Sequence, residues 1–490
     1  MNSGRLMLAA LLLGCAGPVS AHGGNPADAA AEYRFGDEAS LDRRIEEVRA
    51  DYGIIGGAVA AGRSDRVLYE RAFGFADREE GRAATTDTPF ALASVTKPIT
   101  AIAIMMLVDE GKVDLDAPVN RYLGDNGVRA TFGGADEITV RRVMSHTAGL
   151  PFLYELSYAD ARQPLPDFAG LMDRYGYTIL PPGVSSQYSN LGYEILAEIV
   201  TRQSGMPWHD FVHSRIFGPL ELSSASIALA AARPEGAAQR YMVDGSIVPG
   251  ADTSHRGAAS AYMSVSDLLK LGQFWLRAYR GESRLLSRAS AVAMATNSEG
   301  ELAAGAGHGF FMEDYKGTLY VSHGGSMAGT KARLGILPEK DLVIAVLLNE
   351  QNSYAEAFLG EEMIRSFEPA HNFYWDPPKA PSALQGKWSG TIGGNGPIAR
   401  LDLDFTDLDH PLARIDGNDV AIRSAGGEGP YRFRLDGAID GAGFGVPHDL
   451  RFFLIEHEEG LVGEVRLEPL PQMDRANGGV GYWVKLSRVE

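Results

Sequence analysis

The sequence predicts an α+β fold: an antiparallel sheet flanked by helices, with a helical insertion, followed by a small all-β domain. Strand-like segments occur at residues 56–74 and return at 309–349, and the pattern between them is mainly helical. Beyond a proline-rich stretch, residues 385–490 alternate in polarity and are punctuated by Gly, Asp and Asn. Separate strand segments around a helical middle favour one sheet built from both ends of a domain.

The first 21 residues have the pattern of a signal peptide. One positive charge lies in residues 1–5, an apolar core fills residues 6–13, and Val19-Ser20-Ala21 is a small-residue cleavage site. We therefore expect an exported protein, periplasmic or secreted. The small, polar residues 22–37 are expected to be disordered.

Cys15 supports a second interpretation of the same segment. It follows Leu12-Leu13-Gly14, which resembles a bacterial lipobox, so Cys15 is a candidate lipid anchor that would tether the protein to a membrane. It is also the only cysteine in the chain, which excludes an intramolecular disulfide.

The net charge and the hydrophobic content of the chain argue against a nucleic-acid-binding or membrane-spanning protein. The 490 residues carry a formal charge of -18, which argues against nucleic acid, because nucleic-acid binding needs basic patches. A hydrophobic content of 45% is that of a globular protein, and no apolar run beyond the leader is long enough for a membrane span. The oligomeric state has no sequence signal.

A first domain is expected over residues 38–368. Its predicted helices cover residues 41–52, 99–109, 115–123, 193–204, 267–279 and 354–367. Its predicted strands cover residues 56–61, 66–74, 309–313, 318–323, 331–337 and 342–349. The first two strands flank Arg63-Ser64-Asp65 and are expected to form a hairpin.

A linker and a second domain complete the chain. Residues 369–384 contain Trp375-Asp-Pro-Pro-Lys-Ala-Pro381, a proline-rich connector. Residues 385–490 are expected to form a β-barrel or sandwich. Its predicted strands cover residues 388–392, 399–405, 431–435, 450–455, 461–467 and 481–486.

Ser94 and Lys97 are the first candidate site residues. They stand three residues apart at the front of the apolar helix, so both side chains should share one face. Burial and the positive end of the helix dipole both favour a neutral amine, which could take a proton from the serine hydroxyl. The backbone N–H of Ser94 could also face an oxyanion. The alternative is a helix cap beside a surface lysine.

Two further stretches are weaker signals by themselves. Tyr188 and Asn190 lie on a predicted loop at a helix entrance, where they could face a cleft, or could instead pack and cap the helix. His323-Gly324-Gly325-Ser326 follows a predicted strand, and its glycines would let a ligand approach the backbone closely. The alternative there is an ordinary β-turn.

The three stretches occur in the order Ser-x-x-Lys, Tyr-x-Asn, His-Gly-Gly, and in this the chain resembles the serine β-lactamase and penicillin-binding protein superfamily. The resemblance is to the class C-like branch, which includes family VIII esterases, D-aminopeptidases and DD-carboxypeptidases. Further matching segments are 107–118, 144–151 and 335–339. Residues 385–490 resemble the lipocalin-like domains appended to some members.

The resemblance implies a serine hydrolase in which Ser94 forms an acyl-enzyme and Lys97 and Tyr188 share the proton transfer. It implies that Asn190 binds Lys97 or the substrate, and that the N–H groups of Ser94 and Ser326 form an oxyanion hole. No metal or organic cofactor is implied, and the eleven histidines show no metal-ligand spacing.

The third motif departs from the Lys-Thr-Gly of many β-lactamases. A histidine at position 323 is only partly charged near neutrality, and Gly324 offers no side chain. We therefore expect esters first, then D-amino-acid peptides or amides. The alternatives are a catalytically weak receptor for cell-wall peptides, a lactonase or transesterase, or a β-lactamase with low activity.

Overall fold

The computed structural model describes most of the chain from Glu38 onward. The described residues are 38–159, 164–242, 244–297, 305–315, 318–350, 355–368, 384–393, 396–407, 412–426, 431–437, 448–457, 460–469 and 480–489. The predicted signal peptide, its Cys15, the predicted disordered segment and all of the predicted linker except Leu384 lie outside these ranges.

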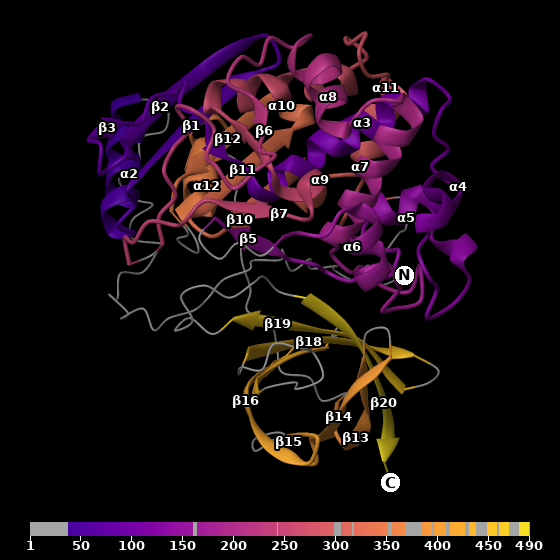
Figure 1. Ribbon diagram of the computed structural model, residues 1–490. Coiled ribbons are helices and arrows are strands. Elements are labelled where there is room, and N and C mark those ends of the chain that lie inside the picture. Colours follow the sequence, from indigo (N-terminus) through magenta and orange to yellow (C-terminus); the bar gives the residue numbers. More distant parts are fainter. Residues whose placement is uncertain are drawn as a thin grey trace, which may run out of the picture.

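A seven-stranded antiparallel sheet, in the order β3-β2-β1-β12-β11-β10-β9, is the centre of the first domain (Figure 1). Its strands are β1 (Gly56–Arg63), β2 (Arg66–Asp77), β3 (Arg82–Ala83), β9 (Phe311–Tyr315), β10 (Thr318–Met327), β11 (Thr330–Leu337) and β12 (Leu342–Leu348). Gly57 of β1 pairs with Leu348 of β12, so both ends of the domain meet in mid-sheet. Strand β12 is buried on both faces, which explains why its sequence is apolar throughout and does not alternate.

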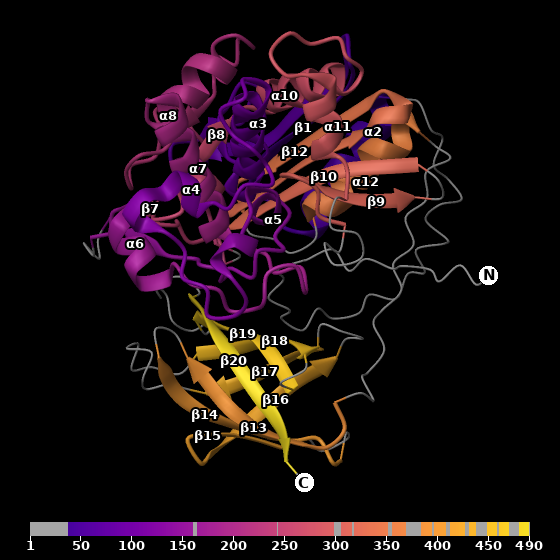
Figure 2. The same ribbon diagram turned by 90° about the vertical axis from the view of Figure 1, so that its right-hand side faces the viewer.

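Helices cover both faces of this sheet. Helices α2 (Glu38–Asp51) and α12 (Ala355–Phe367) pack on one face, and α10 (Val265–Tyr279) packs on the other (Figure 2). Beyond α10 lies α3 (Thr96–Asp109), whose residues from Thr96 to Leu107 are all buried. A helix that is apolar on all sides belongs in a domain interior, and α3 occupies that position.

The insertion between β2 and β9 contains the remaining helices of the first domain. They are α4 (Asn120–Leu123), α5 (Val140–Met144), α6 (Phe168–Tyr175), α7 (Asn190–Ser204), α8 (Trp208–Val212), α9 (Arg256–Ala259) and α11 (Arg288–Met294). Short strands join them: β4 (Phe90–Ala91), β5 (Leu156–Tyr158), β6 (Ser226–Ile227), β7 (Ala251–Thr253) and β8 (Ala261–Met263).

The second domain is a closed eight-stranded antiparallel barrel. Its strands are β13 (Lys387–Gly393), β14 (Pro397–Asp404), β15 (Leu412–Ile415), β16 (Asn418–Gly426), β17 (Tyr431–Gly437), β18 (His448–His457), β19 (Gly460–Pro469) and β20 (Val480–Val489). Closure comes from the pairing of β13 with β20, so each of the eight described strands is paired on both of its edges. The predicted fold class is confirmed.

Three details of the predicted elements were wrong. Residues 115–119 are not helical, because the backbone N–H of Val119 bonds across to Ile138 and Pro118 forms an isolated bridge with Thr139. Strand β10 runs on to Met327, since its pairing with β11 continues past His323. Strands β15 and β16 were missed, because β15 has only four residues and β16 is largely polar.

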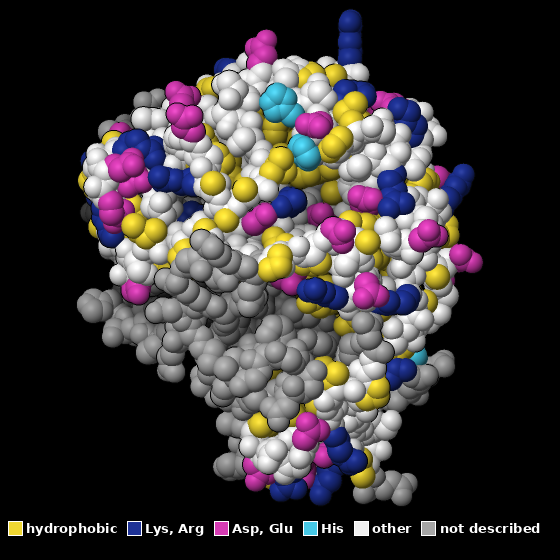
Figure 3. Space-filling model, in the orientation of Figure 1, with side chains coloured by type: hydrophobic (Ala, Val, Ile, Leu, Met, Phe, Trp, Pro, Cys, Tyr) yellow, Lys and Arg dark blue, Asp and Glu magenta, His cyan; other side chains and the backbone are white. Residues whose placement is uncertain are grey.

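The barrel lies against the insertion of the first domain through β18, β19 and β20 (Figures 1 and 2). The ammonium group of Lys485 in β20 sits 4.0 Å from the ring centre of Phe132. On the face shown in Figure 3, acidic and basic side chains are interspersed.

Candidate active site

Ser94 lies in η1 (Ala93–Val95), a single 3-10 turn that runs directly into α3. The preceding Ala93 has a φ of 46°, in the left-handed region, which costs a non-glycine residue about 1–2 kcal/mol. The N–H of Leu92 donates to the carbonyl oxygen of Ala261 in β8 at 2.8 Å. The N–H of Val95 donates to the carbonyl oxygen of Leu92 at 3.1 Å. The surrounding packing therefore maintains the sharp turn that precedes the serine.

Lys97 is completely buried, one helical turn after Ser94. Its Nζ lies 3.2 Å from Oγ of Ser94, 2.7 Å from Oδ1 of Asn190 and 3.2 Å from the carbonyl oxygen of Ala258. Burial lowers the pKa of the Lys97 ammonium well below its usual value. No carboxylate is among these three oxygen partners, so the neutral amine is the favoured form.

The three contacts of Lys97 match the valences of a neutral amine. A neutral amine has two N–H groups and one lone pair. The carbonyl oxygens of Asn190 and Ala258 can only accept, so they take the two N–H groups. The lone pair is then left for the hydroxyl of Ser94.

The ring of Tyr188 lies beside the lysine. Nζ of Lys97 is 4.7 Å from the centre of the Tyr188 ring. That ring packs on His146 at 4.4 Å between centroids, and Nδ1 of His146 accepts the N–H of Ser189 at 3.1 Å. His146 thus supports the segment that carries Tyr188.

Asn190 is the first residue of α7 rather than a loop residue. The helix cap is Ser189, whose Oγ accepts the N–H of Gly192 at 2.9 Å, so the capping alternative for Asn190 is wrong. The Asn190 side chain donates through Nδ2 to the carbonyl oxygen of Leu153 at 2.7 Å. This bond aims Oδ1 at Lys97.

The third motif runs along the edge of β10. Strand β9 pairs with β10 only as far as Ser322, and the rest of β10 packs against η1. A Cβ on Gly325 would lie 2.1 Å from the carbonyl oxygen of Leu92, whereas one on Gly324 would meet nothing within 4 Å. Gly325 is therefore what lets β10 approach the turn before Ser94 so closely.

His323 is buried beside the site, and it is uncharged. Its Nδ1–H donates to the carbonyl oxygen of Gly324 at 2.7 Å. Burial, the largest cause, lowers its pKa to about 3 despite that hydrogen bond. The expectation of a partly charged histidine near neutrality was therefore wrong, because it took no account of burial.

The structure thus brings together Ser94, Lys97, Tyr188 and Asn190, with His323 and Gly325 beside them. Ser326 pairs with Lys331 of β11, and its role as an oxyanion donor stays a prediction.

Sequence reasoning missed one buried residue of the other domain. Glu464 of β19 accepts hydrogen bonds from the backbone of Phe152 and the side chain of Gln187. A glutamate in an alternating strand is usually solvated, so no sequence signal marked it.

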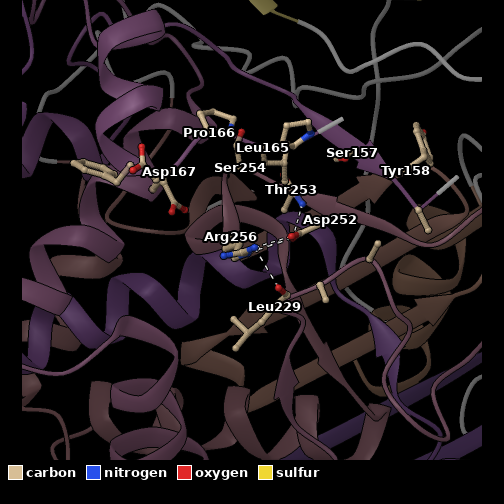
Figure 4. A pocket seen from close by; sticks show the side chains of 16 residues that line it. Ser157, Tyr158, Leu165, Pro166, Asp167, Leu229, Asp252, Thr253, Ser254 and Arg256 are labelled. Atoms are coloured by element: carbon tan, nitrogen blue, oxygen red, sulfur yellow. Dashed lines mark hydrogen bonds and ion pairs between the residues drawn. The ribbon is translucent and has the colours of Figure 1, made fainter. Parts of the chain in front are cut away.

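A separate cavity of about 540 Å³ lies between β5, α6, β7 and α9 (Figure 4). Its lining includes Asp252, Arg256 and Glu194, and Arg256 pairs with Asp252 at 2.6 Å across it. Burial raises the pKa of Glu194 to about 7, although the N–H of Gly257 donates to this carboxylate. Helix α9 contributes to both the cavity and the active site, because Arg256 lines the cavity and the carbonyl oxygen of Ala258 contacts Nζ of Lys97.

Within the described ranges, no group of three His, Cys, Asp or Glu side chains is placed to hold a metal ion. In that same part of the chain, no helix combines the length and apolarity of a membrane span.

The family model described as Beta-lactamase matches residues 41–366. The chain belongs to the beta-lactamase family. It is a serine hydrolase, as the resemblance implied, and its relatives in this family carry several different activities in their names.

Three curated relatives illustrate this range. Penicillin-binding protein 4 of Amycolatopsis lactamdurans is 30% identical over 64% of this chain and 85% of its own length. Esterase EstB of Burkholderia gladioli is 34% identical over 41% of this chain and 54% of its own length. A D-aminopeptidase of Brucella ovis is 26% identical over 66% of this chain and 62% of its own length.

Solved structures of the beta-lactamase fold extend the likeness to both domains. The octameric penicillin-binding protein homologue from Pyrococcus abyssi superimposes with a TM-score of 0.57 at 20% identity, covering 92% of this chain and all of that one. SurE superimposes with a TM-score of 0.62 at 22% identity, covering 92% of this chain and 98% of that one. At these identities the likeness shows the fold alone.

Proposed function

We propose that this protein is an exported hydrolase that cleaves esters, and secondarily D-amino-acid peptides or amides, through an acyl-enzyme on Ser94. The observation that carries the proposal is the environment of Lys97. This amine is fully buried, and if its two N–H groups go to the carbonyl oxygens of Asn190 and Ala258, its lone pair is left for the Ser94 hydroxyl at 3.2 Å. A base within hydrogen-bond reach of a serine is what activates that serine as a nucleophile.

In the proposed reaction, Ser94 Oγ attacks the substrate carbonyl carbon while its proton passes to the Lys97–Tyr188 pair. The tetrahedral oxyanion is stabilised by the N–H groups of Ser94 and Ser326. The pair then protonates the departing alcohol or amine, which leaves an ester on Ser94. Water hydrolyses this ester by the same steps and regenerates the serine hydroxyl.

The order of substrates follows from the third motif. A neutral, buried His323 offers no fixed charge to a substrate carboxylate, and Gly324 offers no hydroxyl. Aromatic rings surround Tyr188 instead, including Phe152 and Phe311, at centroid distances of 6.1 and 6.2 Å. We take these apolar surroundings of Tyr188 to favour substrates with uncharged, apolar acyl groups. The relatives named as an esterase and a D-aminopeptidase agree with these two substrate classes.

The purified mature protein should hydrolyse p-nitrophenyl esters and be labelled by a fluorophosphonate. The Ser94→Ala variant should lose both properties, and unchanged turnover in this variant would refute the proposal. A panel of p-nitrophenyl butyrate, D-alanine p-nitroanilide and a chromogenic cephalosporin tests the order of substrates. We expect the highest kcat/KM for the ester and the lowest for the cephalosporin.

A further inference from the structure

The outer face of the barrel is buried at β19 and half-buried at β20. Val462 and Glu464 of β19 lie opposite Lys485 and Trp483 of β20, so these four side chains share one face of the sheet. The barrel interior is filled by the alternate residues, including Leu461, Val465, Val484 and Leu486. Val462 and Glu464 therefore point out of the barrel, yet both are 0% exposed. For Glu464 the covering groups include Phe152 and Gln187 of the first domain.

Glu464 is the polar centre of this contact. One carboxylate oxygen accepts the backbone N–H of Phe152 at 2.9 Å, and the other accepts the side-chain amide of Gln187. Burying a carboxylate costs several kcal/mol unless donors replace its lost water, and these two donors do so. A buried acidic group in this position therefore needs both partners.

Both partners of Glu464 belong to the segments that hold the active site. Gln187 immediately precedes Tyr188 in the chain. The carbonyl oxygen of Phe152 accepts the N–H of Asn190 at 2.7 Å, while the next residue, Leu153, accepts the Asn190 side chain. Through two hydrogen-bonded segments, Glu464 thus reaches both of the residues that flank Lys97.

We infer that Glu464 is a positioning residue: the barrel uses this side chain to hold the Tyr188 and Asn190 segments in their catalytic arrangement. The inference rests on the proposed function, because it assigns the barrel a part in that same site. It makes the second domain a component of catalysis that does not touch the reacting atoms.

The Glu464→Gln variant tests this in the full-length protein. Glutamine keeps the size of the side chain but can accept with only one end, so its NH2 group faces one of the two donors. Small misplacements of catalytic groups cost large factors in rate, so we expect kcat for a p-nitrophenyl ester to fall about tenfold to a hundredfold. KM should change by less than about threefold, because substrate contacts remain.

An exchange of the two partners provides the rescue. Gln187→Glu alone places two carboxylates against each other and should lower kcat at least as far as Glu464→Gln does. When both substitutions are combined, the amide introduced in β19 donates to the carboxylate introduced before Tyr188 and can still accept from Phe152. In this double variant kcat should return to within about threefold of the wild type, as compensation between contacting residues predicts. Failure of the double variant to recover any activity would overturn the inference.

Lys485→Met is the matched control. It removes the charge from the neighbouring barrel contact on Phe132 and leaves Glu464, Phe152 and Gln187 unchanged, so kcat should stay within about twofold of the wild type. Wild-type kcat in folded Glu464→Gln, or an equal loss in both variants, refutes positioning by Glu464. If Ser94→Ala retains turnover, the proposed function itself fails, so the two failures are distinguishable.

Discussion

Nζ of Lys97 lies 2.7 Å from Oδ1 of Asn190, although 93 residues separate them in the chain. Lys97 is 0% exposed and Asn190 is 3% exposed. The amide orients the amine without adding charge, because it offers a carbonyl oxygen where a carboxylate would have raised the pKa of the lysine. This neutrality of the partner is the basis of the first prediction.

Asn190→Asp should move the pH dependence of the enzyme. A carboxylate beside Lys97 favours the ammonium form and raises its pKa, so the fraction of neutral amine at a given pH falls. We expect kcat/KM at neutral pH to drop about tenfold or more, with partial recovery as the pH is raised. Asn190→Ala, which adds no charge, is the control: its pH profile should keep the acid limb of the wild type.

Lys97→Arg should be inactive although it retains a basic side chain. The guanidinium keeps its protons in proteins, so it has no lone pair for the Ser94 hydroxyl. Loss of a general base typically costs about 10²–10⁴ in rate. Burst-phase labelling of Ser94 by a fluorophosphonate measures the effect directly, and labelling at the wild-type rate would contradict the role of Lys97.

Substitution by alanine should destabilise the protein at Gly325 but not at the adjacent Gly324. Gly325→Ala places a Cβ against the carbonyl oxygen of Leu92, and such overpacking costs about 1–3 kcal/mol. It should also displace the turn before Ser94 and lower kcat. Gly324→Ala points into open space and should leave the stability within about 0.5 kcal/mol. Thermal unfolding and ester kinetics on this pair of variants check both expectations.

His308 should make the first domain less stable in acid. It is fully buried, and burial lowers its pKa from 6.5 to about 4. As the pH falls, the imidazole of His308 is therefore protonated in the unfolded state before it is protonated in the folded state. The stability that the neutral His308 contributes is complete above pH 6.5 and is lost toward pH 4. The full loss amounts to about 3 kcal/mol.

The measurement for His308 compares the wild type with His308→Gln by calorimetry between pH 7.5 and 4.5. Other titrating groups are common to both proteins, so the difference in unfolding free energy should shrink as the pH falls. A difference that does not change with pH would show that His308 is not the source of the acid sensitivity.

Much of the first domain could be predicted, because its patterns are local. The apolar stretch from Ile99 to Leu107 dictates a buried helix, and the spacing of Ser94 and Lys97 places them on one face of its first turns. The hairpin β1–β2 follows from two strand-like segments on either side of the polar turn Arg63-Ser64-Asp65. Each of these features depends on residues close together in the chain.

The rest depends on partners distant in the chain. Burial of His323 against η1 fixes its charge, and nothing in His-Gly-Gly reveals that packing. The contact of Glu464 with Phe152 joins two domains, so no local pattern could indicate it. Strand β15 is too short to produce a period of its own.

The pairing of β1 with β12 affects how the chain can fold during synthesis. Until Leu348 emerges to meet Gly57, the early hairpin has an unpaired edge while the whole insertion is being made. Closing so long a loop is slow, and exposed strand edges associate with other chains in the meantime. One edge of β1 therefore stays exposed until the last central strand of the sheet is in place.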